Sequence, residues 1–351
     1  MATIQFRRDT ASNWTSSNPT LFLGELGVET DTYKIKMGDG STAWTSLGYL
    51  SWNAAPYVIA HTIQGETSGY TTGGTSPSSP PKVNTIDKFP FSSDVNATDV
   101  GDLLAAADTG AGQSSSDNGY NSGGAEYNQP QNNVIQKFPF SSDGNATDVG
   151  DLTVARQNLA GQSSADSGYA SGGWVPGTSN VIDKFPFSSD ADATDVGDLT
   201  VARWGTTGQS SSTHGYTSGG PPGNAIDKFP FSSDANATDV GDLTVGRKAM
   251  AGQSSDANGY NSGGDETPAI NVIEKFSFSS DGNGSDVGDL TVGREGGAGQ
   301  SSTASGYTSG GAWPPSTKYN VIDKFPFSSD ANATDVGDLT VARYGVSGQQ
   351  V

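Results

Sequence analysis

The sequence contains no cysteine and only two histidines, which narrows the chemistry open to it. Without cysteine there is no disulfide and no thiolate metal site. Neither His61 nor His214 stands in a context that links it to a nucleophile and an acid, so a hydrolytic triad has no support. We therefore expect a protein that is not an enzyme and that needs no cofactor.

Basic residues and long apolar runs are also scarce. The 18 Lys and Arg stand against 38 Asp and Glu, which gives a formal net charge of −20. An acidic chain without a basic patch is a poor ligand for nucleic acid or anionic membrane. No apolar run approaches the roughly 20 residues of a membrane span, and the first eight residues lack the apolar region of a signal peptide. Nucleic-acid binding, membrane insertion and secretion by a signal peptide are therefore not expected.

An internal repeat dominates the chain from Trp52 onward. Its Lys-Phe-Pro-Phe core begins at Lys88, Lys137, Lys184, Lys228, Lys275 and Lys324, with Ser277 replacing proline in the fifth copy. A second signature, Gly-Tyr-x-x-Gly-Gly, keeps the same spacing. Hydrophobic content is only 32%, but each copy places the same apolar residues at fixed positions, which argues against disorder. Periods of about 40–50 residues indicate radial or stacked repeats.

Each copy divides into four expected β-strands. In the fourth copy these cover residues 208–211, 215–220, 224–233 and 240–247, and residues 234–239 form the turn before the last strand. The aromatic-Gly-Gly strand end, the Asn-x-(Val/Ile)-(Asp/Glu) strand and a recurrent arginine resemble Kelch and galactose-oxidase-like β-propellers. The predicted fold is thus all-β: a small N-terminal β domain at residues 1–52, then a six-bladed Kelch-like propeller at residues 53–351.

Two details of the repeat concern its ends and its interior. Residues 57–64 supply a first strand for the first blade, yet residues 344–351 begin another copy, so the tail replaces, doubles or extends that strand. The recurrent arginines are expected to pair with acids or carbonyls between blades. They are Arg156, Arg203, Arg247, Arg294 and Arg343, and Ala107 stands in their place in the first copy.

The first 50 residues share nothing with the repeat. They read Ile4-Gln-Phe-Arg-Arg-Asp9, Trp14, Leu23-Gly-Glu-Leu-Gly27, Lys36-x-Gly-Asp-Gly40 and Trp44. This order of residues resembles the N-terminal domain of bacteriophage receptor-binding tail proteins of the major tropism determinant type. The resemblance implies homotrimerisation, attachment to other virion proteins through residues 1–52, and a place on the tail or capsid surface after synthesis in the host cytoplasm. The alternative is a generic β-module that serves as an oligomerisation cap.

Variation between copies is confined to the loop after Gly-Gly and to the four residues after the repeat arginine. If the strands run antiparallel, both loops emerge on one face. The aromatic residues of these loops are the candidate binding residues: Tyr127, Trp174, Trp204, Trp313, Tyr319 and Tyr344. Aromatic side chains on a rigid scaffold suit stacking on sugars or on protein partners. The alternative is that they cap the core or pack between blades.

The acidic turn at residues 330–338 places oxygen ligands at alternate positions, faintly like a calcium loop. It lacks the order and the distal glutamate of an EF-hand, and hydrogen-bonded turns explain its residues without a metal. Calcium therefore stays an alternative, and no metal ligand is assigned.

These features together predict a tail fibre or receptor-binding adhesin whose variable loops bind a host-surface receptor, with a glycan favoured. One alternative is a fibre or capsid-decoration protein that packs against other virion subunits. Another is a propeller glycan hydrolase, which would need a specific carboxylate pair. Six near-identical acidic turns give no reason to choose one such pair.

Overall fold

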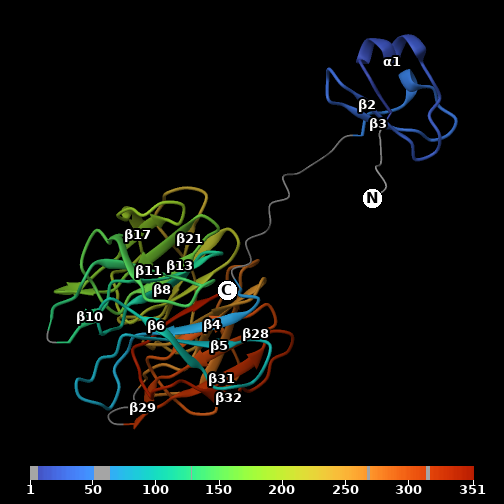
Figure 1. Cartoon of the computed structure of the whole chain (residues 1–351). Coiled ribbons are helices and arrows are strands. Elements are labelled where there is room, and N and C mark those ends of the chain that lie inside the picture. The colour runs from blue at the N-terminus through green and yellow to red at the C-terminus, as the bar shows by residue number, and fades with distance from the viewer. Residues whose placement is uncertain (1–6, 51–63, 128, 267–268, 314–316) are drawn as a thin grey trace. The chain divides into compact units, whose positions relative to one another are not determined.

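The computed structural model describes residues 7–50, 64–127, 129–266, 269–313 and 317–351, and the chain forms two compact units, Met1–Ala60 and His61–Val351 (Figure 1). The expected domain boundary between residues 52 and 53 lies outside the described residues. The predicted all-β class is confirmed, since strands account for nearly all of the regular structure.

The first unit is a three-stranded sheet covered by a short helix. Its strands β1 (Arg7–Asp9), β2 (Leu26–Glu29) and β3 (Ile35–Met37) lie in that order, with β1 parallel and β3 antiparallel to β2. Helix α1 (Ala11–Ser17) begins after Thr10, whose hydroxyl accepts a hydrogen bond from Asn13 N at 3.2 Å. Trp14 stacks on Trp44 of the 3₁₀ helix η1 (Trp44–Ser46), with ring centroids 4.2 Å apart, and this pair forms the small core together with Leu21.

The second unit holds six four-stranded antiparallel sheets within the described residues. Sheet 1 consists of β33 (Ser347–Gln350), β4 (Ser68–Thr72), β5 (Thr85–Pro90) and β6 (Thr98–Asp102), and sheet 2 of β8 (Ala111–Ser114), β9 (Asn118–Ser122), β11 (Val134–Pro139) and β12 (Thr147–Asp151). Sheet 3 consists of β13 (Ala160–Ser163), β14 (Ser167–Ser171), β17 (Val181–Pro186) and β18 (Thr194–Asp198), and sheet 4 of β19 (Thr207–Ser210), β20 (His214–Ser218), β21 (Ala225–Pro230) and β22 (Thr238–Asp242). Sheet 5 consists of β23 (Ala251–Ser254), β24 (Asn258–Ser262), β25 (Val272–Ser277) and β26 (Ser285–Asp289), and sheet 6 of β27 (Ala298–Ser301), β28 (Ser305–Ser309), β31 (Val321–Pro326) and β32 (Thr334–Asp338).

The first strand of every sheet contacts the first strands of the two neighbouring sheets. The contacts run from β8 to β13, β19, β23, β27 and β33, and then back to β8. A glutamine of each first strand donates to a tyrosine carbonyl in the next sheet over 2.8–3.1 Å. The pairs are Gln113–Tyr169, Gln162–Tyr216, Gln209–Tyr260, Gln253–Tyr307, Gln300–Tyr70 and Gln349–Tyr120. The six sheets are therefore linked in a closed cycle.

Sheet 1 is assembled from both ends of the unit. The C-terminal strand β33 pairs antiparallel with β4, with Ser347 opposite Thr72. The tail thus provides the first strand of this sheet, beside β4, which is one of the arrangements that the sequence left open. Residues 57–63 lie outside the described residues. Gln64 follows them, and its side-chain amide donates to Ser254 O at 3.1 Å.

Apolar contacts between neighbouring sheets form the core. Between sheets 3 and 4, Tyr169 and Ile182 pack against Phe229, and the Tyr169 and Phe229 ring centroids lie 5.5 Å apart. A Cβ on Gly215 would lie 2.3 Å from Cζ of Phe229, so only glycine lets the ring lie against the strand. This contact explains the glycine of the repeated Gly-Tyr pair, because the same close approach recurs in every sheet.

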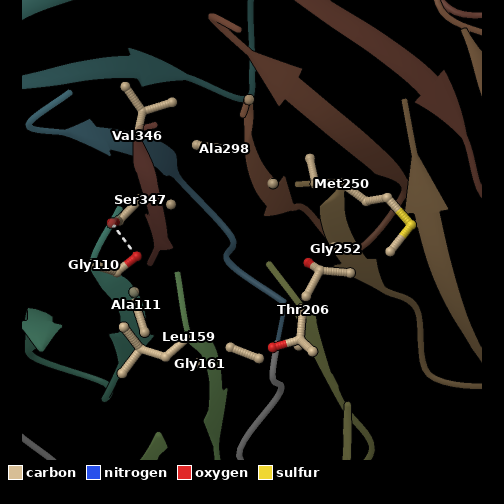
Figure 2. A pocket seen from close by; sticks show the side chains of 18 of the residues that line it. Gly110, Ala111, Leu159, Gly161, Thr206, Met250, Gly252, Ala298, Val346 and Ser347 are labelled. Carbon is tan, nitrogen blue, oxygen red and sulfur yellow. Dashed lines mark hydrogen bonds between the residues drawn. The ribbon is translucent and has the colours of Figure 1, made fainter. Parts of the chain in front are cut away.

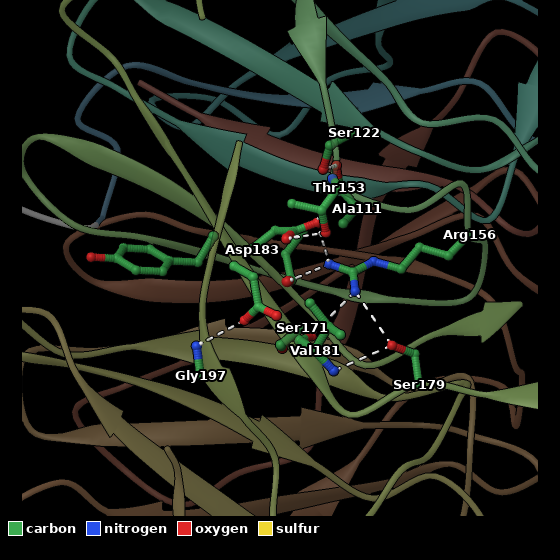
Figure 3. Close-up of polar contacts among 12 residues, drawn as sticks. Ala111, Ser122, Thr153, Arg156, Ser171, Ser179, Val181, Asp183 and Gly197 are labelled. Carbon is green, nitrogen blue, oxygen red and sulfur yellow. Dashed lines mark hydrogen bonds and ion pairs between the residues drawn. The ribbon is translucent and has the colours of Figure 1, made fainter. Parts of the chain in front are cut away.

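The repeat arginines join five of the six pairs of neighbouring sheets, as predicted. Figure 3 shows Arg156 beside Asp183, at a nitrogen–oxygen distance of 3.0 Å and with both side chains fully buried. The equivalent pairs are Arg203–Asp227, Arg247–Glu274, Arg294–Asp323 and Arg343–Asp87. Burial lowers the pKa of Arg156, and the charge of Asp183 opposes that shift.

At the junction of sheets 1 and 2 both charges are missing, because Ala107 replaces the arginine and Gln136 replaces the acid. There Gln136 Oε1 accepts a hydrogen bond from Leu104 N at 2.7 Å.

The fourth strand of each sheet starts and ends earlier than expected. In sheet 4 it is β22 (Thr238–Asp242), not residues 240–247, and the turn before it covers residues 231–237 instead of 234–239. The pairing register shifts between Ile226 and Asp227, and residues 243–247 then leave the sheet. They do so because Arg247 has to reach Glu274 in the next sheet, 2.6 Å away.

Candidate functional site

Two sets of loops come together on one face of the second unit. The loop between the second and third strands pairs with the loop that precedes the first strand of the same sheet. The paired positions are Ala125–Asp108, Gln157–Trp174, Lys248–Asp265, Glu295–Ala312 and Thr75–Tyr344. The predicted convergence of the variable loops is therefore confirmed, and we call this surface the loop face.

A continuous ring of backbone hydrogen bonds supports the loop face. It is formed by Thr109, Asn158, Gly205, Ala249, Gly296 and Gly345, one from each loop that precedes a first strand. Each N–H donates to the carbonyl of the neighbouring member at 2.7–2.8 Å, and the last bond returns to Thr109. All six have φ between 55° and 66°, the left-handed region that glycine adopts most easily. We call this set the rim ring. Its closed bonding holds the loops in one geometry.

The residue just before each member of the rim ring differs in every copy. The six residues are Asp108, Gln157, Trp204, Lys248, Glu295 and Tyr344. Only the two aromatic ones, Trp204 and Tyr344, were predicted as binding residues, and the other four were not. The signal was available, because each residue directly follows the repeat arginine or, for Asp108, the alanine that replaces it. We call these six the mouth positions.

A cavity of about 330 Å³ lies among the first strands, and residues of all six sheets line it (Figure 2). Four of the mouth positions contribute to its lining: Trp204, Lys248, Glu295 and Tyr344. Its walls are largely backbone, because a glycine stands at the second position of each first strand. Those glycines are Gly112, Gly161, Gly208, Gly252, Gly299 and Gly348, and a Cβ on each would lie 2.0–2.3 Å from a neighbouring glycine carbonyl.

The six aromatic candidates do not form one cluster. Trp204 and Tyr344 line the cavity, and Trp174 packs edge-on against Trp204 with ring centroids 5.8 Å apart. Tyr127 is exposed on a loop, Trp313 is exposed in the short strand β29 (Ala312–Trp313), and Tyr319 is half-buried; none of the three lines the cavity. The loop aromatics therefore divide into a group of three at the cavity mouth and three separate side chains.

Charged groups surround the aromatic side chains of the mouth. Lys248 Nζ lies 3.2 Å from Asp265 Oδ2 and 4.9 Å from the centroid of the Trp204 ring. Burial, and next the charge of Asp265, raise the pKa of Glu295, while Lys248 acts to lower it. Burial also raises the pKa of Tyr344, with further contributions from Asp108 and Glu295.

The acidic turns on the other edge of each sheet serve as contacts between sheets. In the fourth copy the Asn236 side chain accepts a hydrogen bond from Asp198 N at 3.0 Å. Asp281 of the next copy pairs with Lys228 at 3.0 Å. Among the described residues, no group of three or more His, Asp or Glu side chains could hold a metal ion. In the same part of the chain, no helix is long and apolar enough to cross a membrane.

Comparisons with known proteins concern only a short part of the chain. Residues 4–42 match the family described as the major tropism determinant N-terminal domain. Two curated proteins named hyaluronoglucosaminidase, from Streptococcus pyogenes phages H4489A and H10403, are 44% and 42% identical over 48 residues. The match covers 14% of this chain and 13% and 14% of the relatives' own lengths. The chain therefore carries an N-terminal domain of the phage tropism-determinant type, as its sequence predicted.

Proposed function

We propose that this protein is a non-enzymatic bacteriophage virion protein that binds a receptor on the host surface, with a glycan as the favoured receptor. The N-terminal domain of the phage tropism-determinant type supports the virion assignment. The second unit would present the receptor-binding surface as a Kelch-like propeller of six blades. The closed cycle of contacts among the first strands supports that architecture, since a ring of sheets leaves few open edges.

The main support for the proposal is that the strands are nearly constant among the copies while the mouth positions vary. The strands barely differ among the six copies, whereas the six mouth positions hold six different residue types. Stability does not demand this variety, because the rim ring gives all six loops the same backbone geometry. Different side chains on one face of a constant scaffold are typical of a surface that recognises another molecule.

The first unit would attach the protein to other virion proteins and hold the chains as a homotrimer. Phe22, Leu23 and Tyr33 are each more than 80% exposed in the single chain. Large exposed apolar side chains on a small domain favour a contact surface. Several copies on one particle would strengthen weak single-site binding by raising the effective concentration.

Binding of the purified full chain to bacterial cells tests the proposal. Saturable binding should fall when Trp204 and Tyr344 are both replaced by alanine. It should persist in His214→Asn, which alters a strand end outside the cavity lining and copies Asn118 and Asn258 of other repeats. A folded protein that binds no candidate host would contradict the proposal and favour a structural role within the particle.

One observation favours a second candidate, a glycan hydrolase. Glu295 has a raised pKa and stands near Asp265 at the mouth, and a pair of carboxylates in different environments is what glycoside hydrolysis uses. The names of the two relatives agree with this chemistry, although the match covers only 48 residues. Release of reducing ends from a polysaccharide, abolished by Glu295→Gln, would establish the hydrolase.

A further inference from the structure

We propose that the cavity mouth binds a single uncharged sugar residue and excludes acidic sugars. This inference rests on the proposed function, and it adds the chemical class of the ligand. The site consists of Trp204, Lys248, Glu295 and Tyr344, which come from four successive loops and line the same cavity.

The size of the cavity limits the ligand. At about 330 Å³ it lies at the lower end of the range of about 300–1,000 Å³ that is typical of small-molecule sites. Its walls cannot widen easily, because the glycine backbones already touch and the rim ring is fully hydrogen-bonded. One sugar unit therefore fits within it, and the rest of a longer glycan would lie over the loops.

The aromatic side chains at the mouth are held in place before a ligand arrives. Trp204 packs edge-on against Trp174 and lies under the Lys248 ammonium. The Tyr344 ring is also held by a lysine: Lys318 Nζ lies 5.5 Å from its centroid and donates to Ser76 O at 2.7 Å. Aromatic rings that are already fixed lose little conformational entropy on binding. They can therefore bind a ligand that offers only a small apolar surface, such as the C–H face of a sugar.

The charges decide which sugar the mouth accepts. Lys248 is paired with Asp265, so its positive charge is already matched. In the described part of the chain, the Glu295 carboxylate has no ion-pair or hydrogen-bond partner, although it is half-buried. A half-buried acceptor has lost part of its hydration and is stabilised by donors, which two neighbouring hydroxyls of a sugar supply. A uronate or sialate would instead place a second negative charge beside the Glu295 carboxylate, which pairs with no cation in the described residues, on a chain with net charge −20.

Titration calorimetry with the full chain tests this inference. The probes are neutral trisaccharides of hexose and N-acetylhexosamine units and uronate-containing trisaccharides of the same length. At least one neutral probe should bind and the uronate probes should not. Glu295→Gln should weaken neutral-sugar binding at least tenfold, Trp204→Ala should abolish it, and His214→Asn should leave it unchanged. Circular dichroism of each variant would exclude loss of folding.

Each other result has a distinct meaning. Equal or tighter binding of the uronate probes would overturn the inference, and so would an unchanged affinity in Glu295→Gln. Binding to cells that depends on Trp204 and Tyr344, without binding to any neutral probe, would overturn the sugar assignment and leave the adhesin function standing. Failure to bind both cells and sugars would contradict the two proposals together.

Discussion

Arg343 and Asp87, from opposite ends of the repeat region, form a fully buried ion pair with a nitrogen–oxygen distance of 3.2 Å. The arginine also donates to Thr71 O at 2.9 Å, and the Thr340 hydroxyl donates to Asp87 at 2.7 Å. This network joins sheet 6 to sheet 1, where the strand from the tail also completes the sheet. The junction between the two ends of the repeat region therefore has the same kind of buried ion pair as the four junctions from sheet 2 to sheet 6.

Replacing Asp87 by glutamine should destabilise the protein by about 3–5 kcal/mol, because it leaves the guanidinium of Arg343 buried without its counter-charge. Urea denaturation of the full chain measures the loss. The matched control is the double variant Arg343→Ala/Asp87→Gln, which copies the neutral pair of Ala107 and Gln136 at the junction of sheets 1 and 2. The double variant should be more stable than the single one. If the double variant loses as much stability as Asp87→Gln or more, the two charges are not coupled.

Replacing Gly208 by alanine should prevent the first strands from packing, because the new Cβ would lie 2.0 Å from Gly161 O. Both atoms belong to backbones fixed by neighbouring sheets, so relief would require a strand to shift. We expect a loss of more than about 3 kcal/mol, beyond the usual cost of overpacking. Thermal unfolding should compare this variant with Gly144→Ala, whose Cβ would meet nothing within 4 Å. Alanine already stands at the equivalent Ala235, so a large loss there would be unexpected.

Replacing Trp204 by alanine should separate binding from stability. The side chain is only partly buried, and it contacts Trp174 and Lys248 at the mouth and belongs to no buried core cluster. The free energy of unfolding should fall by no more than about 1 kcal/mol, within the range of substitutions outside the core. Leu243→Ala, at a buried position, should cost about 2–5 kcal/mol and serves as the comparison. A loss of that size in Trp204→Ala would assign the indole to the core instead of the binding surface.

Glu295 should make binding and stability respond to pH in opposite directions. Burial and the nearby Asp265 raise its pKa in the folded state, so ionised Glu295 costs stability above that pKa. The cost disappears as the pH falls through the raised pKa, whereas sugar binding weakens there because the acceptor becomes protonated. Glu295→Gln should therefore be more stable than the wild type at neutral pH. The difference in free energy of unfolding should vanish below the ordinary glutamate pKa of about 4.5.

Calorimetry between pH 4 and 8 would follow sugar binding and the free energy of unfolding in wild type and in Glu295→Gln. The affinity of the variant should not change over the interval in which the wild type loses affinity. The groups that face Glu295 are Asp265 and Lys248, so Asp265→Asn should shift the wild-type midpoint to lower pH. A midpoint that does not move would show that the titrating group is not Glu295.

The sequence predicted the parts of the fold that recur. Because the repeat places Tyr, Ile and Phe at constant positions, it indicated the sheets and their shared core. The recurrent arginines could be assigned to contacts between sheets because a cation next to a strand end needs a buried partner. The ends of the fourth strand could not be read in the same way. In sheet 4 the apolar pattern continues through Leu243 and Val245, although the chain has already left the sheet to bring Arg247 to its partner.

The site was less predictable because its members share a place in the fold and not a chemical type. Lys248 and Glu295 are ordinary polar loop residues until the rim ring brings their loops together. Nor does the local sequence indicate that Thr109 and Ala249 adopt left-handed backbone, which costs energy in residues other than glycine. The hydrogen bonds around the rim offset that cost, and they form only in the assembled second unit.

The most direct test of the account compares the full chain with two variants for saturable binding to the host surface polysaccharide. One variant carries Trp204→Ala and Tyr344→Ala at the mouth, and the other carries His214→Asn outside the cavity lining. The mouth variant should lose binding while it keeps its melting temperature within a few degrees, and His214→Asn should bind as the wild type does. Equal binding by all three proteins would contradict a receptor site on the loop face.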